Sequence, residues 1–291
     1  MARNLKKSQA LSAAKDFRSS LGANSARNLA LVLSSTNQCR IPRYARNDSG
    51  GPSIIILPSL LAAILTCSLA SLSQETPGNP PQVNVDDEGV FDISLAGRQV
   101  GSESFRIHSS WGKIEAQAEI SLHVEQNGKT VSAQSFPDLV LDPQLHPITY
   151  TWNQKGSKSS RLEVDLRGKV AKVCYKTING SEDDRDFELP SDVAILDDNV
   201  FHHYQLIVAR YLAMEGGKQT FHIFVPQEAL PSLLTVEDVG NAAGTNGGVP
   251  ANLRHLLITT DVTHIDLWVD NLQHLERVSV PSAQLEAIRK R

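Results

Sequence analysis

The sequence predicts a mainly β protein in which a curved antiparallel sheet, a half-barrel or meander, is covered by one α-helix. Apolar and polar residues alternate with a period of two in several segments, which is typical of half-buried strands. Residues that tolerate a positive φ separate these segments, and one segment has a strong helical period. A sheet with one apolar face has to curl over its own core or be covered by another element.

The alternation places the strands in chain order. Phe91, Ile93 and Leu95 share one face of the first strand, and residues 116–124 form a long half-buried strand. Further strands are expected at 162–166, 221–225, 253–259, 265–270 and 275–280. Hairpin turns are expected at Ala96-Gly97-Arg98, Asn127-Gly128, Arg167-Gly168-Lys169 and Asn179-Gly180. Hairpins in series predict an antiparallel meander.

One helix is predicted at 198–214, because its apolar residues follow the spacing of a single wide stripe. These residues are Val200, Phe201, Tyr204, Ile207, Val208, Tyr211 and Leu212. Asp197 or Asp198 can cap the start of the helix, and Gly216-Gly217 can end it. His202 is expected on the opposite, exposed face. The glycine-rich segment 240–250 is expected to be a mobile loop that can act as a flap over a groove.

Residues 54–72 form an apolar run with Arg40, Arg43 and Arg46 before it and no Lys or Arg after it until Arg98. This is the charge profile of an export signal, so residues 51–73 are interpreted as a signal peptide or anchor. A lipoprotein signal at Cys67 is a third alternative.

Residues 1–50 are too long for an ordinary leader, which indicates either a start assigned too far upstream or an organelle-type presequence. The Pro-rich residues 74–88 are expected to be a linker, 89–281 the β domain and 282–291 a C-terminal tail.

Charge differs sharply along the chain. Residues 1–73 hold nine Lys and Arg and two acids, a net charge of +7. The whole chain holds 28 bases and 32 acids, which leaves 19 bases and 30 acids in residues 74–291, a net charge of −11. An acidic domain does not suit nucleic-acid binding, which needs clustered cations. We expect an exported domain in the periplasm or at the outer surface of the cytoplasmic membrane.

Residue types that carry chemistry form no motif. Cys174 is the one cysteine after residue 73 and is expected to be a partly buried small residue. His202 and His203 lack the i, i+4 spacing of a helical metal site, and His255, His264 and His274 are interpreted as surface or edge residues. Residues 183–186, an acidic cluster, are expected in a solvated turn. The sequence therefore predicts no catalytic residue, no metal site and no cofactor.

A resemblance rests on the strand with Phe91, Ile93 and Leu95, the spacing Gly97-x-x-x-Gly101, and the closing segments at Asp270-Asn271 and 277–281. These segments resemble uncharacterised exported proteins of Gram-negative bacteria over about residues 89–281. The resemblance implies a half-barrel around a helix, similar to the periplasmic lipoprotein carriers LolA and LolB. The single predicted helix departs from those carriers, and no family site residue can be placed on this chain.

Together these features predict a non-catalytic envelope protein that binds a lipid or other amphiphile between the curved sheet and the helix. The overall acidity favours a neutral or zwitterionic ligand. Residues expected to line the groove are His203, Tyr204, Ile207 and Tyr211, at one border of the stripe. A secreted hydrolase with an unrecognised site and an assembly factor acting through a sheet edge are the alternatives.

Overall fold

The structure of the chain is a computed structural model that describes residues 85–126, 129–156, 159–177, 180–214, 216–246 and 249–290. The predicted leader, the predicted signal or anchor and most of the predicted linker lie outside these residues. The described elements are β1 (Asp87–Leu95), β2 (Arg98–Ser110), β3 (Lys113–Gln126), β4 (Lys129–Leu141), β5 (Pro147–Gly156), β6 (Ser160–Asp165), β7 (Val170–Thr177), β8 (Glu182–Glu188), β9 (Ala194–Ile195), α3 (His202–Ala213), β10 (Gln219–Val225), η1 (Pro226–Glu228), β11 (Leu230–Asn246), β12 (Val249–Thr259), β13 (His264–Val269), β14 (Leu275–Val280), η2 (Pro281–Ala283) and β15 (Leu285–Lys290).

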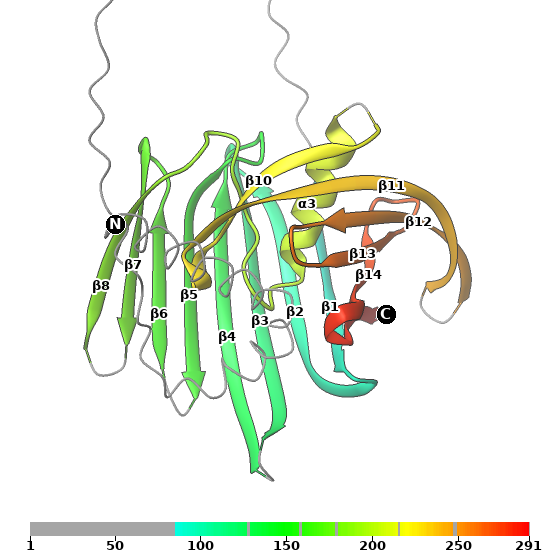
Figure 1. Cartoon of the computed structure of the whole chain (residues 1–291), viewed down its shortest axis with the longest axis horizontal. Helices are drawn as coiled ribbons and strands as arrows, with labels where there is room; N and C mark the ends of the chain where they lie inside the picture. Colours follow the sequence, from blue (N-terminus) through cyan, green and yellow to red (C-terminus); the bar gives the residue numbers. More distant parts are fainter. Residues whose placement is uncertain are drawn as a thin grey trace, which may run out of the picture. The chain divides into compact units, whose positions relative to one another are not determined.

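The strands form one large curved sheet in the order β8-β7-β6-β5-β4-β3-β2-β1-β15-β14-β13-β12-β11-β10-β9 (Figure 1). All neighbouring strands are antiparallel except β9 and β10, which pair in parallel. Two meanders are joined where β1 pairs with β15, a contact between residues about 200 positions apart. This architecture confirms the predicted mainly β fold with a curved antiparallel sheet and one helix in the described part of the chain.

Turn chemistry explains two of the hairpins. Ala96 and Gly97 have φ values of 50° and 74°, as a two-residue turn with two positive φ angles requires, so the predicted turn between β1 and β2 is confirmed. Trp111 and Gly112 form a turn with the same φ values between β2 and β3. The sequence did not predict this second turn, because Trp is not a turn residue.

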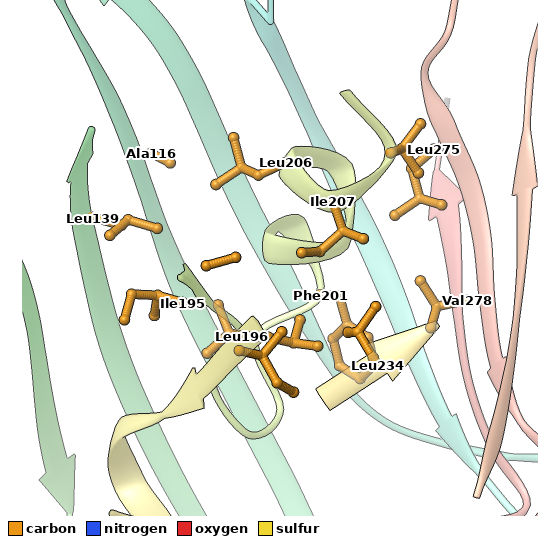
Figure 2. Close-up of a cluster of buried hydrophobic side chains, with 14 of the residues drawn as sticks. Ala116, Leu139, Ile195, Leu196, Phe201, Leu206, Ile207, Leu234, Leu275 and Val278 are labelled. Atoms are coloured by element: carbon orange, nitrogen blue, oxygen red, sulfur yellow. The ribbon is translucent and has the colours of Figure 1, made fainter. Parts of the chain in front are cut away.

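Helix α3 lies inside the curve of the sheet (Figures 1 and 2). Its side chains reach both meanders, with Leu206 toward Ala116 and Leu139 and with Ile207 toward Leu275. Ile207 and Val208 are fully buried, and His202, Gln205 and Ala209 on other sides of the helix are buried as well. The helix is therefore enclosed on most of its surface, whereas the sequence predicted one buried stripe and an exposed face.

Side-chain contacts connect the two edges of the sheet. Phe187 of β8 lies against Phe224 of β10, with ring centroids 5.0 Å apart. Tyr175 of β7 donates a hydrogen bond from its hydroxyl to the carbonyl oxygen of Pro226, at 2.6 Å. The sheet remains an open one, because β8 and β9 stand at opposite ends of the strand order.

Four expectations about segments are wrong. Residues 240–250 are no flap, since β11 runs to Asn246 and β12 begins at Val249. Residues 282–291 are no tail, since they contain β15. The acidic residues 183–186 lie in strand β8 and not in a turn. The linker ends before 88, because β1 starts at Asp87. Each segment is held by pairing with a neighbouring strand, in a hairpin for 183–186 and 240–250 and between distant residues for β1 and β15, and local composition does not reveal this pairing.

Candidate functional site

The four residues expected to line a groove lie in or against the core. His203, Ile207 and Tyr211 are at most 1% exposed, and Tyr204 packs against the core as a partly buried residue. Tyr211 also donates its hydroxyl to the carbonyl oxygen of Gly217, at 2.8 Å. Three concave sites on the surface of the described residues, one of which is described below, are lined by other residues. These four side chains therefore help the helix to fill the concave side of the sheet.

A buried carboxylate caps α3 from another strand. Glu103 of β2 is fully buried and accepts hydrogen bonds from the backbone N–H groups of Phe201 and His202, both at 2.7 Å. It also accepts one from Nδ1 of His202, at 2.7 Å. The first turn of a helix has unpaired N–H groups and a positive dipole end, and a carboxylate satisfies both. The expected caps Asp197 and Asp198 are wrong, because Phe201 is the N-cap residue and no side chain caps the helix locally.

His202 and His203 use Nδ1 in opposite roles in this network. His202 donates from Nδ1 to the Glu103 carboxylate. His203 accepts at Nδ1 from the Asp197 backbone N–H, at 3.2 Å, so its proton lies on Nε2. The rings are 4.7 Å apart, and neither Nε2 has a hydrogen-bond partner among the described residues. Burial lowers the pKa of His203 well below its usual 6.5 and keeps the ring neutral.

Asp197 joins the helix entry to two other elements. Its carboxylate accepts a hydrogen bond from the Tyr150 hydroxyl at 2.5 Å and from the Gln227 backbone N–H at 3.0 Å. Burial raises the pKa of Asp197 from 3.8 to about 6, and its hydrogen bonds only partly offset that effect. The side chains of this interior cluster (Glu103, Tyr150, Asp197, His202 and His203) are at most 3% exposed, so a substrate cannot reach them. The cluster positions α3.

One concave site rich in charged side chains lies at one end of the strands, where β1, β2, β14 and β15 meet. We call it the rim cleft; its volume is about 750 Å³. Its lining combines three carboxylates, two arginines, two histidines and two apolar residues. They are Asp86, Asp87, Glu88, Arg106, Ile107, His108, Leu272, His274 and Arg289.

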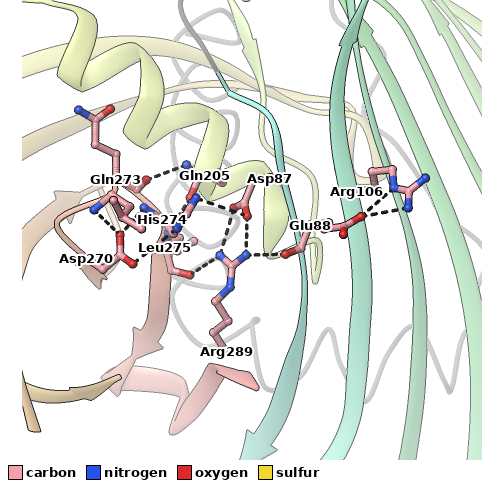
Figure 3. Close-up of polar contacts among 10 residues, drawn as sticks. Asp87, Glu88, Arg106, Gln205, Asp270, Gln273, His274, Leu275 and Arg289 are labelled. Atoms are coloured by element: carbon pink, nitrogen blue, oxygen red, sulfur yellow. Dashed lines mark hydrogen bonds and ion pairs between the residues drawn. The ribbon is translucent and has the colours of Figure 1, made fainter. Parts of the chain in front are cut away.

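An ion pair forms the floor of the rim cleft. Arg289 donates to both carboxylate oxygens of Asp87, at 3.1 and 2.5 Å, and to the carbonyl oxygens of Glu88 and Leu275 (Figure 3). The side chains of Arg289 and Asp87 are 8% and 4% exposed. A paired, hydrogen-bonded arginine of this kind fixes the ends of β1, β14 and β15 relative to one another.

The loop between β13 and β14 is rigidly held beside this ion pair. Asp270 accepts from the backbone N–H groups of Leu272 and His274, at 2.9 and 2.8 Å. Gln205 of α3 binds the same loop through the carbonyl oxygen of Gln273 and the N–H of Leu275 (Figure 3). His274 thereby lies between two acids, with Nδ1 3.5 Å from Asp270 and Nε2 4.0 Å from Asp87.

The outer wall of the rim cleft has two exposed pairs. Arg106 contacts Glu88 at 3.0 Å, with 72% and 70% of the two side chains exposed. His108 lies 4.0 Å from Asp86, and both are well exposed. Exposed pairs contribute little to stability, so a ligand of mixed charge can replace one of them at a small cost. The rim cleft is therefore the described site best suited to a polar, zwitterionic group.

Sequence reasoning missed most of this site. The sequence predicts Asp87 in the linker and Arg289 in the tail, and it predicts His274 as a surface or edge residue. A usable signal existed for Glu103, because it lies on the same side of β2 as Phe105 and Ile107. An acid on the buried face of a strand predicts a buried partner.

Other candidate residues have structural roles. Cys174 is partly buried in β7, as expected, and the hydrogen bond that its thiol donates to the Asp184 carboxylate, together with burial, raises its pKa to about 11. His255 stacks on Trp268 and contacts Asp266 at 2.8 Å. Within the described ranges, no group of three or more His, Cys, Asp or Glu residues is arranged to hold a metal ion. The helices described there include none that is long and apolar enough to cross a membrane.

Comparisons with known proteins give only distant similarities. No protein-family model matches the chain. No curated protein matches its sequence. Among solved structures, a β-barrel-like protein of the domain of unknown function DUF1849 from Brucella abortus aligns with a TM-score of 0.49 and 10% identity, covering 70% of this chain and 94% of that one. A DUF1089 family protein from Pseudomonas aeruginosa aligns with a TM-score of 0.39 and 13% identity, covering 62% and 89%. Neither similarity connects the chain to LolA or LolB.

Proposed function

We propose that the chain is an exported domain of the cell envelope that binds the polar head group of a zwitterionic amphiphile in the rim cleft and performs no chemistry on it. The export part rests on the sequence, where the apolar run 54–72 follows basic residues and precedes an acidic domain. The binding part rests on one observation, the mixed-charge rim cleft of about 750 Å³.

The charges in the cleft support the class of ligand. Arg106 offers a planar guanidinium to an anionic group such as a phosphate, and Glu88 beside it offers a carboxylate to an ammonium group. A zwitterion can contact both and keep the total charge of the cleft unchanged. The net charge of −11 for residues 74–291 disfavours a purely anionic ligand. Relative to the sequence-based prediction, the ligand class is the same and the site moves from the helix to the rim.

Soluble head-group analogues test the proposal directly. Glycerophosphoethanolamine and glycerophosphocholine are titrated into the protein while backbone NMR shifts are recorded, and shifts are expected around β1, β2 and the β13–β14 loop. Arg106→Ala should weaken binding about tenfold, because it removes the anion contact. The matched control is Arg161→Ala, because Arg161 makes the same kind of exposed pair with Glu163 outside the cleft. An affinity that does not change with Arg106→Ala contradicts this site.

Native mass spectrometry provides a second test. The protein isolated gently from its own envelope is expected to carry a neutral or zwitterionic amphiphile, which organic extraction identifies. An empty protein that also fails to bind either analogue contradicts the proposed function.

One observation favours a second candidate function. The Asp270–His274 pair has the arrangement in which a carboxylate orients a histidine that acts as a general base. The rim-cleft lining contains no Ser, Thr or Cys, so a hydrolase here would have to activate water. Ester hydrolysis that is lost in His274→Ala, in protein that still binds the head-group analogues, would favour this alternative.

A further inference from the structure

We infer that the end of the sheet that carries the rim cleft faces a lipid bilayer, with Trp111 inserted into the interfacial region. This inference rests on the export part of the proposed function and not on ligand binding in the cleft. It begins with the exposure of one side chain. Trp111 is fully exposed, whereas Trp152 is 7% exposed and Trp268 is covered by His255 on one face and Arg277 on the other.

The turn itself does not explain a tryptophan at this position. Trp111 has a φ of 50°, in the left-handed region, where a bulky side chain is an outlier and Asn, Asp or Gly is favoured. The turn at Ala96-Gly97 has the same backbone geometry with a small residue at the equivalent place. Strain of this kind is typical of residues retained for a function and not for local stability.

Another exposed apolar side chain lies at the same end. Leu272, in the β13–β14 loop, is 68% exposed and lines the rim cleft together with Ile107 of β2. The strand pairings place the start of β1, the β2–β3 turn and the β13–β14 loop at one end of the strands. The Ala96-Gly97 turn lies at the other end.

The position at which the chain enters the domain indicates that a lipid bilayer is what contacts the Trp111 end. Val85 leads directly into β1 at the end that carries Trp111. Twelve residues (73–84) separate Val85 from the apolar run 54–72, and twelve residues span at most about 40 Å. If this run is in the membrane, the Trp111 end is the part of the domain nearest to the lipid. Trp is the residue type most suited to a membrane interface, since one edge of its ring is polar and the rest is apolar.

Quenching of tryptophan fluorescence by lipid tests this inference. The full chain, which keeps residues 54–72, is reconstituted in vesicles of phosphatidylcholine with brominated acyl chains. All three tryptophans lie in the described domain, so emission from Trp111 can be isolated by substitution. Quenching is expected in the unmodified chain and is expected to be lost in Trp111→Asn.

The matched control moves the tryptophan to the turn at the opposite end of the strands. In the double variant Trp111→Asn, Ala96→Trp, a tryptophan occupies the same turn geometry away from the predicted lipid surface and should not be quenched. Trp111→Asn should also keep or raise the melting temperature, because Asn tolerates a positive φ better than Trp. Quenching that persists in Trp111→Asn, equal quenching in the double variant, or a lower melting temperature of Trp111→Asn overturns the inference.

The proposal of head-group binding and the inference of bilayer contact can be refuted independently of each other. The soluble analogues report on the rim cleft in the absence of vesicles, whereas quenching requires a bilayer. Quenching without analogue binding supports the membrane-facing end and removes the ligand from the proposed function. Analogue binding without quenching supports the ligand and overturns the membrane-facing end.

Discussion

Replacing Glu103 with alanine should destabilise the protein by about 3–5 kcal/mol, because it removes one partner from a buried charged network. Glu103 is fully buried and accepts three hydrogen bonds of 2.7 Å. The variant leaves two backbone N–H groups and the Nδ1–H of His202 without an acceptor. Each hydrogen bond to a charged group contributes about 1.5–3 kcal/mol, and entry of water into the new space reduces the sum.

Urea unfolding measures this loss. With a slope of about 2.5 kcal/mol per molar urea for a domain of this size, a loss of 4 kcal/mol lowers the midpoint by about 1.6 M. Glu103→Gln keeps the volume and one acceptor oxygen but places an NH₂ group against the helix N–H groups, so an intermediate loss is expected. Glu119, on the exposed side of β3, is the matched control, and Glu119→Ala should change stability by less than about 0.5 kcal/mol.

Hydrogen exchange locates the effect. The amides of Phe201 and His202 should lose protection in Glu103→Ala more than amides in the centre of the sheet, because Glu103 is their acceptor. Equal urea midpoints for Glu103→Ala and Glu119→Ala would refute the reasoning, since the interior cluster would then contribute no more to stability than an exposed side chain.

Substitutions at four further positions test the buried groups. Asp197→Asn should lose stability as the pH falls from about 6.5 to 4, by up to about 1.4 kcal/mol per pH unit, because His203 takes up a proton in the unfolded chain but stays neutral in the folded protein. His203→Phe should gain stability as the pH falls from about 6 to 4. In that variant Asp197, with a folded-state pKa of about 6, binds a proton more tightly in the folded protein than in the unfolded chain. In the unmodified protein these two effects oppose each other, and urea midpoints at each pH show the slopes. Val208→Asp buries an unpaired charge in the core and should cost several kcal/mol or prevent folding, as circular dichroism would show. Arg289→Ala leaves Asp87 buried without its partner and should cost about 3–5 kcal/mol in the same urea assay, and Arg289→Lys should recover only part of it.

The sequence predicted the elements whose signal is local. The alternation at 116–124 identifies β3, and the pair Ala96-Gly97 identifies a turn, because each depends on neighbouring residues alone. The stripe from Val200 to Leu212 identified α3 within a few residues of its bounds. Its surroundings were not predicted, since the pattern gave no sign that His202 on the other face would also be buried.

Elements whose composition does not suit a strand, and which are stabilised by cross-strand pairing, were not predicted. The glycine-rich end of β11 has the composition of a loop, but its ladder with β12 continues through a bulge at Gly240, where φ is 102°. Strand β15 is short and charged, and it is stable because it joins the two meanders through β1 and β14. Arg289 becomes a buried residue only in that pairing, so its role beside Asp87 could not be read from the tail in which it had been placed.

The filled interior determines where a binding function can be located. A helix that is buried on most of its surface leaves the rim and the outer face of the sheet as the accessible parts of the described domain. The two ends differ in one informative respect, because the same turn geometry holds Ala96 at one end and the fully exposed Trp111 at the other. The Trp111 end also receives the chain at Val85 and contains the rim cleft. A domain held near a membrane at that end would present its mixed-charge cleft to lipid head groups, so the proposed ligand and the proposed orientation require the same face of the molecule.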